Sequence, residues 1–134
     1  MTRVMIVENP AKPMNLAKKL LPSINYDIVF ETYNGYEAIE KYDLVKPDLL
    51  LLDLILEKND GLTVLQEIKK NHPESNVMII TSLQGTRLED CLNSGALACL
   101  SIPYKMRDFL SLVTSLHNPS QKSKIAPVIS EDKF

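Results

Sequence analysis

Short apolar runs alternate with longer segments of helical periodicity along the chain. The runs at 3–7, 26–32, 48–52, 77–80 and 96–102 are rich in Val, Ile and Leu, and each predicts a β-strand. Between them, apolar residues recur three or four positions apart, which predicts amphipathic helices. Strand–helix units in strict alternation indicate an α/β fold: a doubly wound parallel sheet with helices on both faces and right-handed crossovers.

Turn-forming residues set the ends of the predicted helices. Pro22-Ser23 ends the first helix, Asn34-Gly35 forms a turn before the second, and His72-Pro73 ends the third. The last helix has the clearest amphipathic pattern, because its apolar positions follow the spacing i, i+3, i+4, i+7. These positions are Phe109, Leu112, Val113 and Leu116.

The C-terminal part of the chain has a different composition. Residues 118–134 lose the periodicity and gain Pro, Ser and charged residues. The whole chain has 134 residues, which suits one domain large enough to bury a core. We therefore predict one domain over residues 1–117, followed by a flexible tail or linker stub at 118–134.

Composition and charge narrow the class of function. Charged residues make up 24% of the chain and the net charge is −2, which argues against electrostatic binding to nucleic acid. No basic and apolar leader follows Met1 and no apolar stretch approaches about 18 residues, so we expect a cytoplasmic protein without membrane insertion. Cys91 and Cys99 fit apolar positions and form no CxxC pattern, which predicts buried, reduced thiols.

Polar residues gather where the predicted strands end. The third strand is apolar enough to be buried on both faces, and it ends at Asp53. Glu8 and Asn9 follow the first strand, and Thr81 and Ser82 follow the fourth. Since the carboxyl ends of parallel strands meet on one rim of such a sheet, we expect these side chains to surround one point.

Two carboxylates, an amide and a hydroxyl group suit a hard cation and a phosphoryl group. Mg2+ prefers oxygen ligands and is usually held by one or two carboxylates together with phosphate and water. An aspartate can also act as a nucleophile towards phosphorus. The alternative is that these residues are only turn formers and helix caps, and their spacing alone does not separate the two interpretations.

Four sequence blocks at fixed intervals carry a resemblance to a known family. They are PDLLLLDLILEKNDG around Asp53, NGYEAIE at 34–40, VMIITS at 77–82 and GALACLSIPY at 95–104. With these blocks the chain resembles the receiver domain of bacterial-type response regulators from residue 2 to residue 117. The resemblance implies a flavodoxin-like parallel sheet of five strands in the order 2-1-3-4-5. It also implies two-component (phosphorelay) signalling, in which an aspartate receives a phosphoryl group with Mg2+ bound.

The resemblance gives each matching residue an expected role. Asp53 matches the phosphoacceptor, Thr81 the hydroxyl residue that moves towards the phosphoryl group on activation, and Ser82 the small residue after it. For the metal, Glu8 and Asn9 occupy the positions of the acidic pair. Asp53 and the backbone carbonyl of Ile55 complete that ligand set.

The metal site departs from the family pattern at Asn9, since the second residue of the pair is usually an acid. The exchange removes one formal charge, so we expect Mg2+ as a weakly bound cofactor at most. Pro10 stands where a further acid often follows the pair, and Leu56-Glu57 replaces the usual Met-Pro.

Two further departures affect the response to a phosphoryl group. Ile102 stands where the family has a lysine, and Cys99 stands where it has the switch aromatic residue. A hydrogen bond to a charged group is worth about 1.5–3 kcal/mol, so loss of the lysine weakens stabilisation of the phosphorylated state roughly tenfold or more. We therefore expect phosphorylation or switching at Asp53 to be weak or absent.

The implied function is that of a signalling interaction module rather than an enzyme, apart from self-catalysed phosphoryl transfer to and from Asp53. The expected partners are a sensor histidine kinase or phosphotransfer protein. A further partner or a second copy would dock on the face of the fourth helix, fifth strand and fifth helix. Tyr104 lies near that face, either as an exposed contact residue or as a packed ring.

An alternative from another class is a small flavodoxin-like enzyme or nucleotide-binding domain. Such a protein would need a phosphate-binding loop. The glycines are Gly35, Gly61, Gly85 and Gly95, and neither GxGxxG nor GxxxxGK occurs. The sequence therefore favours the receiver interpretation.

Overall fold

The computed structural model describes residues 1–82, 86–116 and 128–129. Within these ranges, six strands form one sheet in the order β2-β1-β3-β4-β5-β6, and every neighbouring pair is parallel. The strands are β1 Thr2–Val7, β2 Tyr26–Thr32, β3 Leu49–Leu52, β4 Val77–Thr81, β5 Ala98–Ser101 and β6 Val128–Ile129. The predicted order 2-1-3-4-5 is confirmed, with β6 added at the edge.

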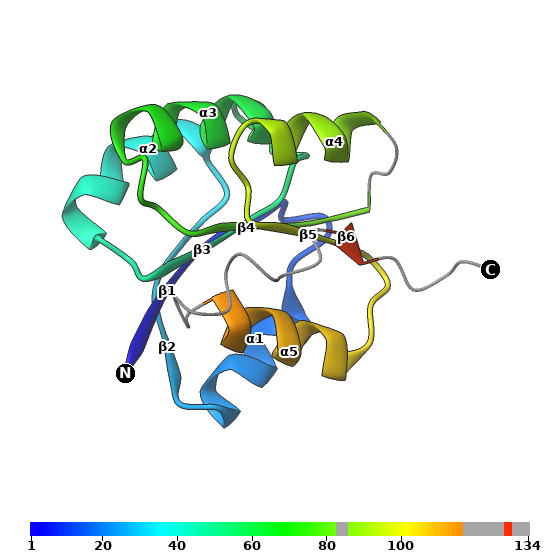
Figure 1. Ribbon diagram of the computed structural model, residues 1–134. Coiled ribbons are helices and arrows are strands. Elements are labelled where there is room, and N and C mark those ends of the chain that lie inside the picture. Colours follow the sequence, from blue (N-terminus) through cyan, green and yellow to red (C-terminus); the bar gives the residue numbers. More distant parts are fainter. Residues whose placement is uncertain (83–85, 117–127, 130–134) are drawn as a thin grey trace.

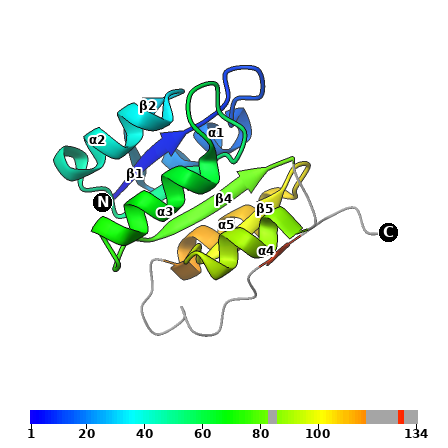
Figure 2. The same cartoon turned by 90° about the horizontal axis from the view of Figure 1, so that it is seen from above.

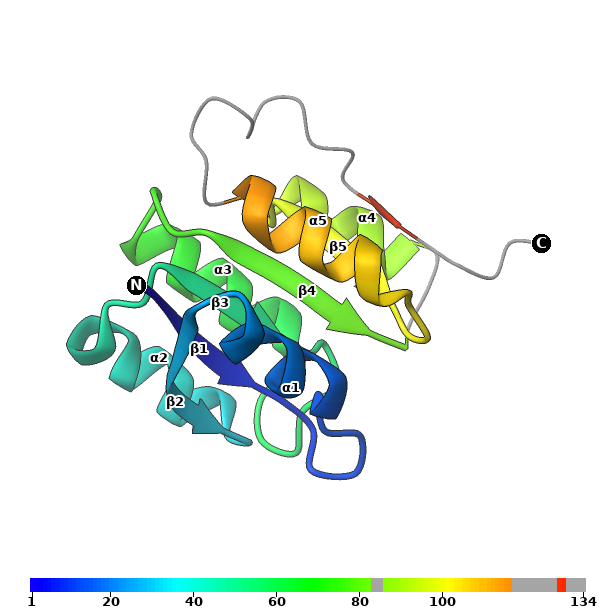
Figure 3. The same cartoon turned by 90° about the horizontal axis from the view of Figure 1, so that it is seen from below.

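Helices cover both faces of the sheet (Figure 1). They are α1 Asn15–Ser23, α2 Gly35–Val45, α3 Gly61–Asn71, α4 Thr86–Asn93 and α5 Met106–Leu116. Figure 2 shows α2, α3 and α4 over one face, and Figure 3 shows α1 and α5 over the other. This three-layer arrangement is the predicted doubly wound α/β fold.

The core has one apolar cluster on each side of the sheet. Leu49 and Leu51 of β3 pack with α1 and α5, whereas Leu50 and Leu52 pack on the side of α2 and α3. All four leucines are buried, as predicted for a strand covered on both faces. Cys91 and Cys99 are both buried, also as predicted.

One helix end agrees with the sequence prediction and another differs from it. α1 ends at Ser23, as predicted from Pro22-Ser23, with Pro22 inside its last turn. Asn34 does not form a simple turn: it is the N-cap of α2, and its side chain accepts hydrogen bonds from the backbone N–H groups of Tyr36 and Glu37. Asparagine suits this position because its side-chain oxygen satisfies N–H groups that have no partner in the first turn.

The C-terminal tail differs from the prediction at the two residues that the structure describes. Residues 128–129 form β6, which pairs with β5 in the register Cys99↔Val128 and Leu100↔Ile129. An open strand edge presents unpaired backbone groups that another segment can satisfy, which explains the pairing. The remainder of the predicted tail lies outside the described residues. Among the described helices, none is both long and apolar enough to cross a membrane.

Candidate functional site

Asp53 lies directly after β3, at the rim formed by the carboxyl ends of the strands. Its backbone N–H donates to the carbonyl oxygen of Val7 at 2.9 Å, which extends the pairing of β3 with β1. Its side-chain Oδ1 accepts a hydrogen bond from the N–H of Ile55 at 3.0 Å. Only 4% of Asp53 is exposed, so the carboxyl group is held in place and largely shielded from water.

The surroundings of Asp53 favour its protonated form. Burial raises the pKa of the carboxyl group above its ordinary value, and the negative charge of Glu8 acts in the same direction. Hydrogen bonds from the Ile55 N–H, the Thr81 hydroxyl and the Leu54 N–H oppose this rise in pKa without cancelling it. The structure thus brings Asp53 and Thr81 into direct contact, and Thr81 is itself fully buried.

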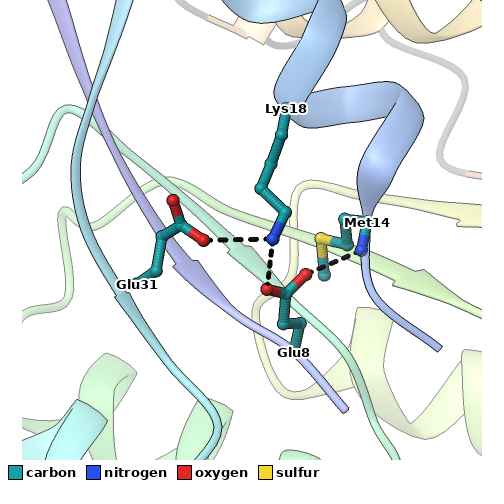
Figure 4. A network of polar contacts seen from close by, with 4 residues as sticks. All are labelled: Glu8, Met14, Lys18 and Glu31. Carbon is teal, nitrogen blue, oxygen red and sulfur yellow. Dashed lines mark hydrogen bonds and ion pairs between the residues drawn. The ribbon is translucent and has the colours of Figure 1, made fainter. Parts of the chain in front are cut away.

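Glu8 is completely buried, and both of its carboxylate oxygens contact other groups of the protein (Figure 4). Its Oε1 accepts a hydrogen bond from the backbone N–H of Met14 at 2.6 Å. Its Oε2 forms an ion pair with the Nζ of Lys18 at 2.6 Å, and the same Nζ lies 3.1 Å from Glu31 Oε1. The sequence analysis missed Lys18 and Glu31, because only the pairing of β1 with β2 and the packing of α1 bring them to Glu8.

Asn9 is also used locally. Its Oδ1 accepts a hydrogen bond from the N–H of Ala11 at 2.8 Å, and its carbonyl oxygen accepts one from the N–H of Lys12 at 2.9 Å. These bonds shape the loop between β1 and α1, so the side-chain oxygen that was expected at a metal stabilises a turn instead.

Ser82 and Ile102 follow β4 and β5. Ser82 is half-buried. The N–H of Ile102 donates to the carbonyl oxygen of Thr81 at 2.9 Å, while its side chain packs against the cluster between the sheet and α1 and α5. Ile102 also lines an apolar pocket of about 220 Å3, together with Pro13 and Met14. The side chain that follows β5 at this point is therefore apolar and carries no charge.

Tyr104 is a packed ring, which decides between the two interpretations left open by the sequence. Its ring stacks on Phe109 with centroids 5.7 Å apart. Burial raises the pKa of the Tyr104 hydroxyl to about 12, and a hydrogen bond to the backbone of Ala17 only partly opposes the rise. Arg107 on α5 is 78% exposed and is the better candidate for a contact residue.

The oxygen ligands expected for Mg2+ do not form a ready coordination sphere. Within the described part of the chain, no group of three or more His, Cys, Asp or Glu residues is placed to hold a metal ion. Both Glu8 oxygens accept other hydrogen bonds, and the Asn9 side-chain oxygen closes a turn. Glu8 and Asn9 are thus engaged by other groups, and water and phosphate would have to complete the octahedral set around Asp53 and the Ile55 carbonyl. The residues present therefore fit the ion poorly.

Comparison with known proteins assigns the family. The sequence model of the protein family described as response regulator receiver domain matches residues 4–114. The chain therefore belongs to the response regulator receiver domain family, whose members act in two-component signalling. Receiver domains interact with histidine kinases or phosphotransfer proteins and generally bind Mg2+ at the phosphorylation site.

Several relatives are chemotaxis proteins. The chain is 29% identical to the chemotaxis protein CheY of Listeria monocytogenes over 106 residues, which cover 78% of this chain and 89% of that protein. It is 27% identical to CheY of Bacillus subtilis over 117 residues, which cover 87% and 98% of the two chains.

Solved structures show the same fold. The crystal structure of the CheX–CheY–BeF3–Mg2+ complex from Borrelia burgdorferi has a TM-score of 0.80 at 26% identity, covering 86% of this chain and 88% of that chain. A CheY-like receiver domain protein from Methanospirillum hungatei also reaches 0.80, at 21% identity and with 93% and 99% covered. These matches support the receiver interpretation over the alternative of a small flavodoxin-like enzyme or nucleotide-binding domain.

Proposed function

We propose that this chain is a receiver module in which Asp53 is the phosphoacceptor and the switch that normally follows phosphorylation is impaired. The observation that carries the proposal is the geometry of Asp53. Its carboxyl group is buried at the end of a central strand, oriented by the Ile55 N–H, and in contact with the Thr81 hydroxyl. Burial also keeps water away from most of the carboxyl group. Its hydrogen bonds hold it in a defined position from which it can attack phosphorus.

The proposed reaction is direct transfer from a phosphohistidine of a kinase or phosphotransfer protein. A carboxylate oxygen of Asp53 attacks phosphorus, a P–O bond forms, and the P–N bond to the donor imidazole breaks. The imidazole takes up a proton as it leaves. In hydrolysis, water attacks the phosphorus, the P–O bond to Asp53 breaks and inorganic phosphate is released.

The Thr81 hydroxyl supplies the first step of the response. In the structure this buried hydroxyl donates to the Asp53 carboxylate. After transfer, the same hydroxyl can donate to a phosphoryl oxygen, because the phosphoryl group carries more negative charge than the carboxylate did. Ile102 contributes no charge at this point, and Cys99 replaces the aromatic side chain that would pass the movement on. We therefore expect an acceptor that is chemically competent but poorly coupled to a change of conformation.

Output in this proposal passes through protein contacts on the face of α4, β5 and α5. The exposed Arg107 lies on α5, and the described residues Glu89 and Asp90 lie exposed on α4. A surface of mixed charge suits a partner with complementary charges or a second copy of the chain, and such complementarity contributes more to specificity than to raw affinity.

Intact-mass spectrometry after incubation with a small phosphodonor tests the acceptor. We expect wild type to gain the mass of one phosphoryl group, and Asp53→Asn to gain none. Asp27→Asn removes a carboxylate from an exposed position on β2 and should still be modified. If Asp53→Asn is modified as fully as wild type, or if wild type is not modified at any donor concentration, Asp53 is not the acceptor.

A further inference from the structure

The carboxylate of Glu8 is fully engaged by groups of the protein, although it stands where receiver domains have a metal ligand. One oxygen accepts from the Met14 N–H and the other from the Lys18 ammonium, each at 2.6 Å. Glu8 is completely buried, whereas the Lys18 side chain is 24% exposed. Figure 4 shows the ammonium group between Glu8 and Glu31, reaching from α1 towards the sheet.

Three elements build this arrangement. Glu8 follows the last residue of β1, and Glu31 pairs with Ile6 in the β1–β2 register, so the two acids lie near each other at the same end of the sheet. Lys18 lies half-buried on α1, and its ammonium group contacts both acids. Burial would lower the pKa of Lys18, but the hydrogen bonds and charges of Glu8 and Glu31 outweigh it and raise the pKa above its ordinary value.

We infer that Lys18 is a resident cation of the acceptor site, and that its ammonium group takes the place at Glu8 that a divalent metal would take. The inference rests on the proposed function, because it concerns the charge balance of the same site. A tethered ammonium is always at high local concentration. A metal ion at Oε2 would have to displace this ammonium and break a hydrogen bond between two charged groups.

Mg2+ is a poor competitor in such a site. It sheds its own water reluctantly and requires a nearly octahedral set of oxygen ligands. Lys18 supplies a compact positive charge with three N–H donors, which suits two carboxylates at once. Lys18 therefore offsets the negative charge of Glu8 without a metal. It does so at the end of β1, whereas the family lysine would stand at the end of β5, where this chain has Ile102.

Calorimetric titration of the full chain with Mg2+ alone tests the inference. Removal of the charge in Lys18→Met should tighten Mg2+ binding on the order of tenfold, since the metal no longer has to displace a charged hydrogen-bond partner from Glu8. Lys19→Met removes an exposed lysine from the same helix and should leave the affinity unchanged. The gain should disappear in Lys18→Met with Glu8→Gln, because the freed carboxylate is then absent.

A second measurement follows the two side chains directly by NMR, in the wild type and in Lys18→Met. The side-chain carboxyl resonance of Glu8 and the ammonium resonance of Lys18 should stay unchanged at Mg2+ concentrations that shift the Glu8 resonance in Lys18→Met. Equal Mg2+ affinity of Lys18→Met and wild type would overturn the inference. So would an early shift of Glu8 in the wild type.

These results are distinct from those that test Asp53. Cation binding is measured without a phosphodonor, so failure of phosphorylation leaves the titration interpretable. Conversely, an unchanged Mg2+ affinity in Lys18→Met would disprove the role of Lys18 as a resident cation. It would not affect the proposal that Asp53 is the acceptor.

Discussion

At the scale of single residues, Asp53 shows that a candidate functional group can lower the stability of the fold. A carboxylate that is 4% exposed loses most of its contact with water, and its hydrogen bonds to Ile55, Leu54 and Thr81 replace that contact only in part. Groups with perturbed pKa values are enriched at functional sites, because chemistry requires charges where packing alone would not place them. Asp53 is such a group, and it directly follows a strand whose residues are all buried.

This argument predicts a pH-dependent gain of stability in Asp53→Asn. Because the folded protein raises the pKa of Asp53 above the ordinary 3.8, it binds the proton more tightly than the unfolded chain does. The stabilising effect of the neutral group is complete below the ordinary pKa and is lost as the pH rises through the raised value. Asp53→Asn should therefore unfold like wild type near pH 3 and resist urea better than wild type at pH 7.

Urea unfolding at several pH values measures the difference. Asp27→Asn is the matched control, since it removes an exposed carboxylate and should change the unfolding free energy by no more than about 0.5 kcal/mol. A variant Asp53→Asn that is less stable than wild type at pH 7 would show that the charged form of Asp53 stabilises the fold, contrary to this account.

Gly61, the first residue of α3, offers a second prediction at the residue scale. A methyl group on its Cα would overlap with the carbonyl oxygen of Asp53 and with the backbone of Leu54. Gly61→Ala should lower the free energy of unfolding by about 2 kcal/mol, because the backbone beside the acceptor must move. Thr63→Ala on the exposed side of α3 is the control and should be nearly neutral. Equal thermal stability of the two variants would contradict this close packing.

At the scale of elements, the apolar runs were sufficient to predict the central strands. β3 was predicted over 48–52 and is found at Leu49–Leu52, since a run of leucines is stable only where both faces are covered. The contacts around Glu8 were not predictable in this way. They depend on the register of β1 with β2 and on the packing of α1, and hydrophobic periodicity contains no information on either.

Strand β6 was missed for a related reason. Its two residues follow a segment rich in Pro, Ser and charge, and a run so short has no periodicity. Only the open edge of β5 gives it a partner. The stacked Tyr104 likewise depends on Phe109 and on α1, so the sequence alone left its position undecided.

The pairing of β6 with β5 leads to a prediction for this edge. Replacing both Val128 and Ile129 by Pro removes the backbone donors and should detach the strand. We expect faster hydrogen exchange along Ala98–Ser101, with a loss of about 1 kcal/mol or less in unfolding free energy, since only two residue pairs are involved.

The control for this experiment is the exchange Val128→Ile with Ile129→Val, which keeps the strand propensity and the backbone donors. Exchange of the amides in β1, which lies inside the sheet between β2 and β3, should be unaffected in both variants. Unchanged exchange in β5 of the proline variant would show that β6 does not protect this edge.

At the scale of the whole molecule, the proposed acceptor and the proposed output face lie on different elements, so in this proposal a signal has to cross part of the sheet. Asp53 follows β3 in the middle, while α4, β5 and α5 lie towards one edge (Figure 1). Thr81 at the end of β4 is the first link. The next position is Cys99, which is fully buried against α4 with its thiol 3.9 Å from the Leu88 carbonyl oxygen. A small buried thiol has no bulky ring to move between two positions.

The last prediction concerns this switch. A ligand shifts a conformational equilibrium only by its differential affinity for the two states. With Ile102 and Cys99 in place, a phosphoryl group on Asp53 has fewer contacts that distinguish one state from the other. Beryllofluoride with Mg2+ should therefore produce small amide chemical-shift changes in α4 and β5 of the wild type. Ile102→Lys should enlarge them, because the ammonium can bind the mimic, whereas Ile102→Met, of similar length and without charge, should not. Large changes across α4 and β5 in the wild type would contradict an impaired switch.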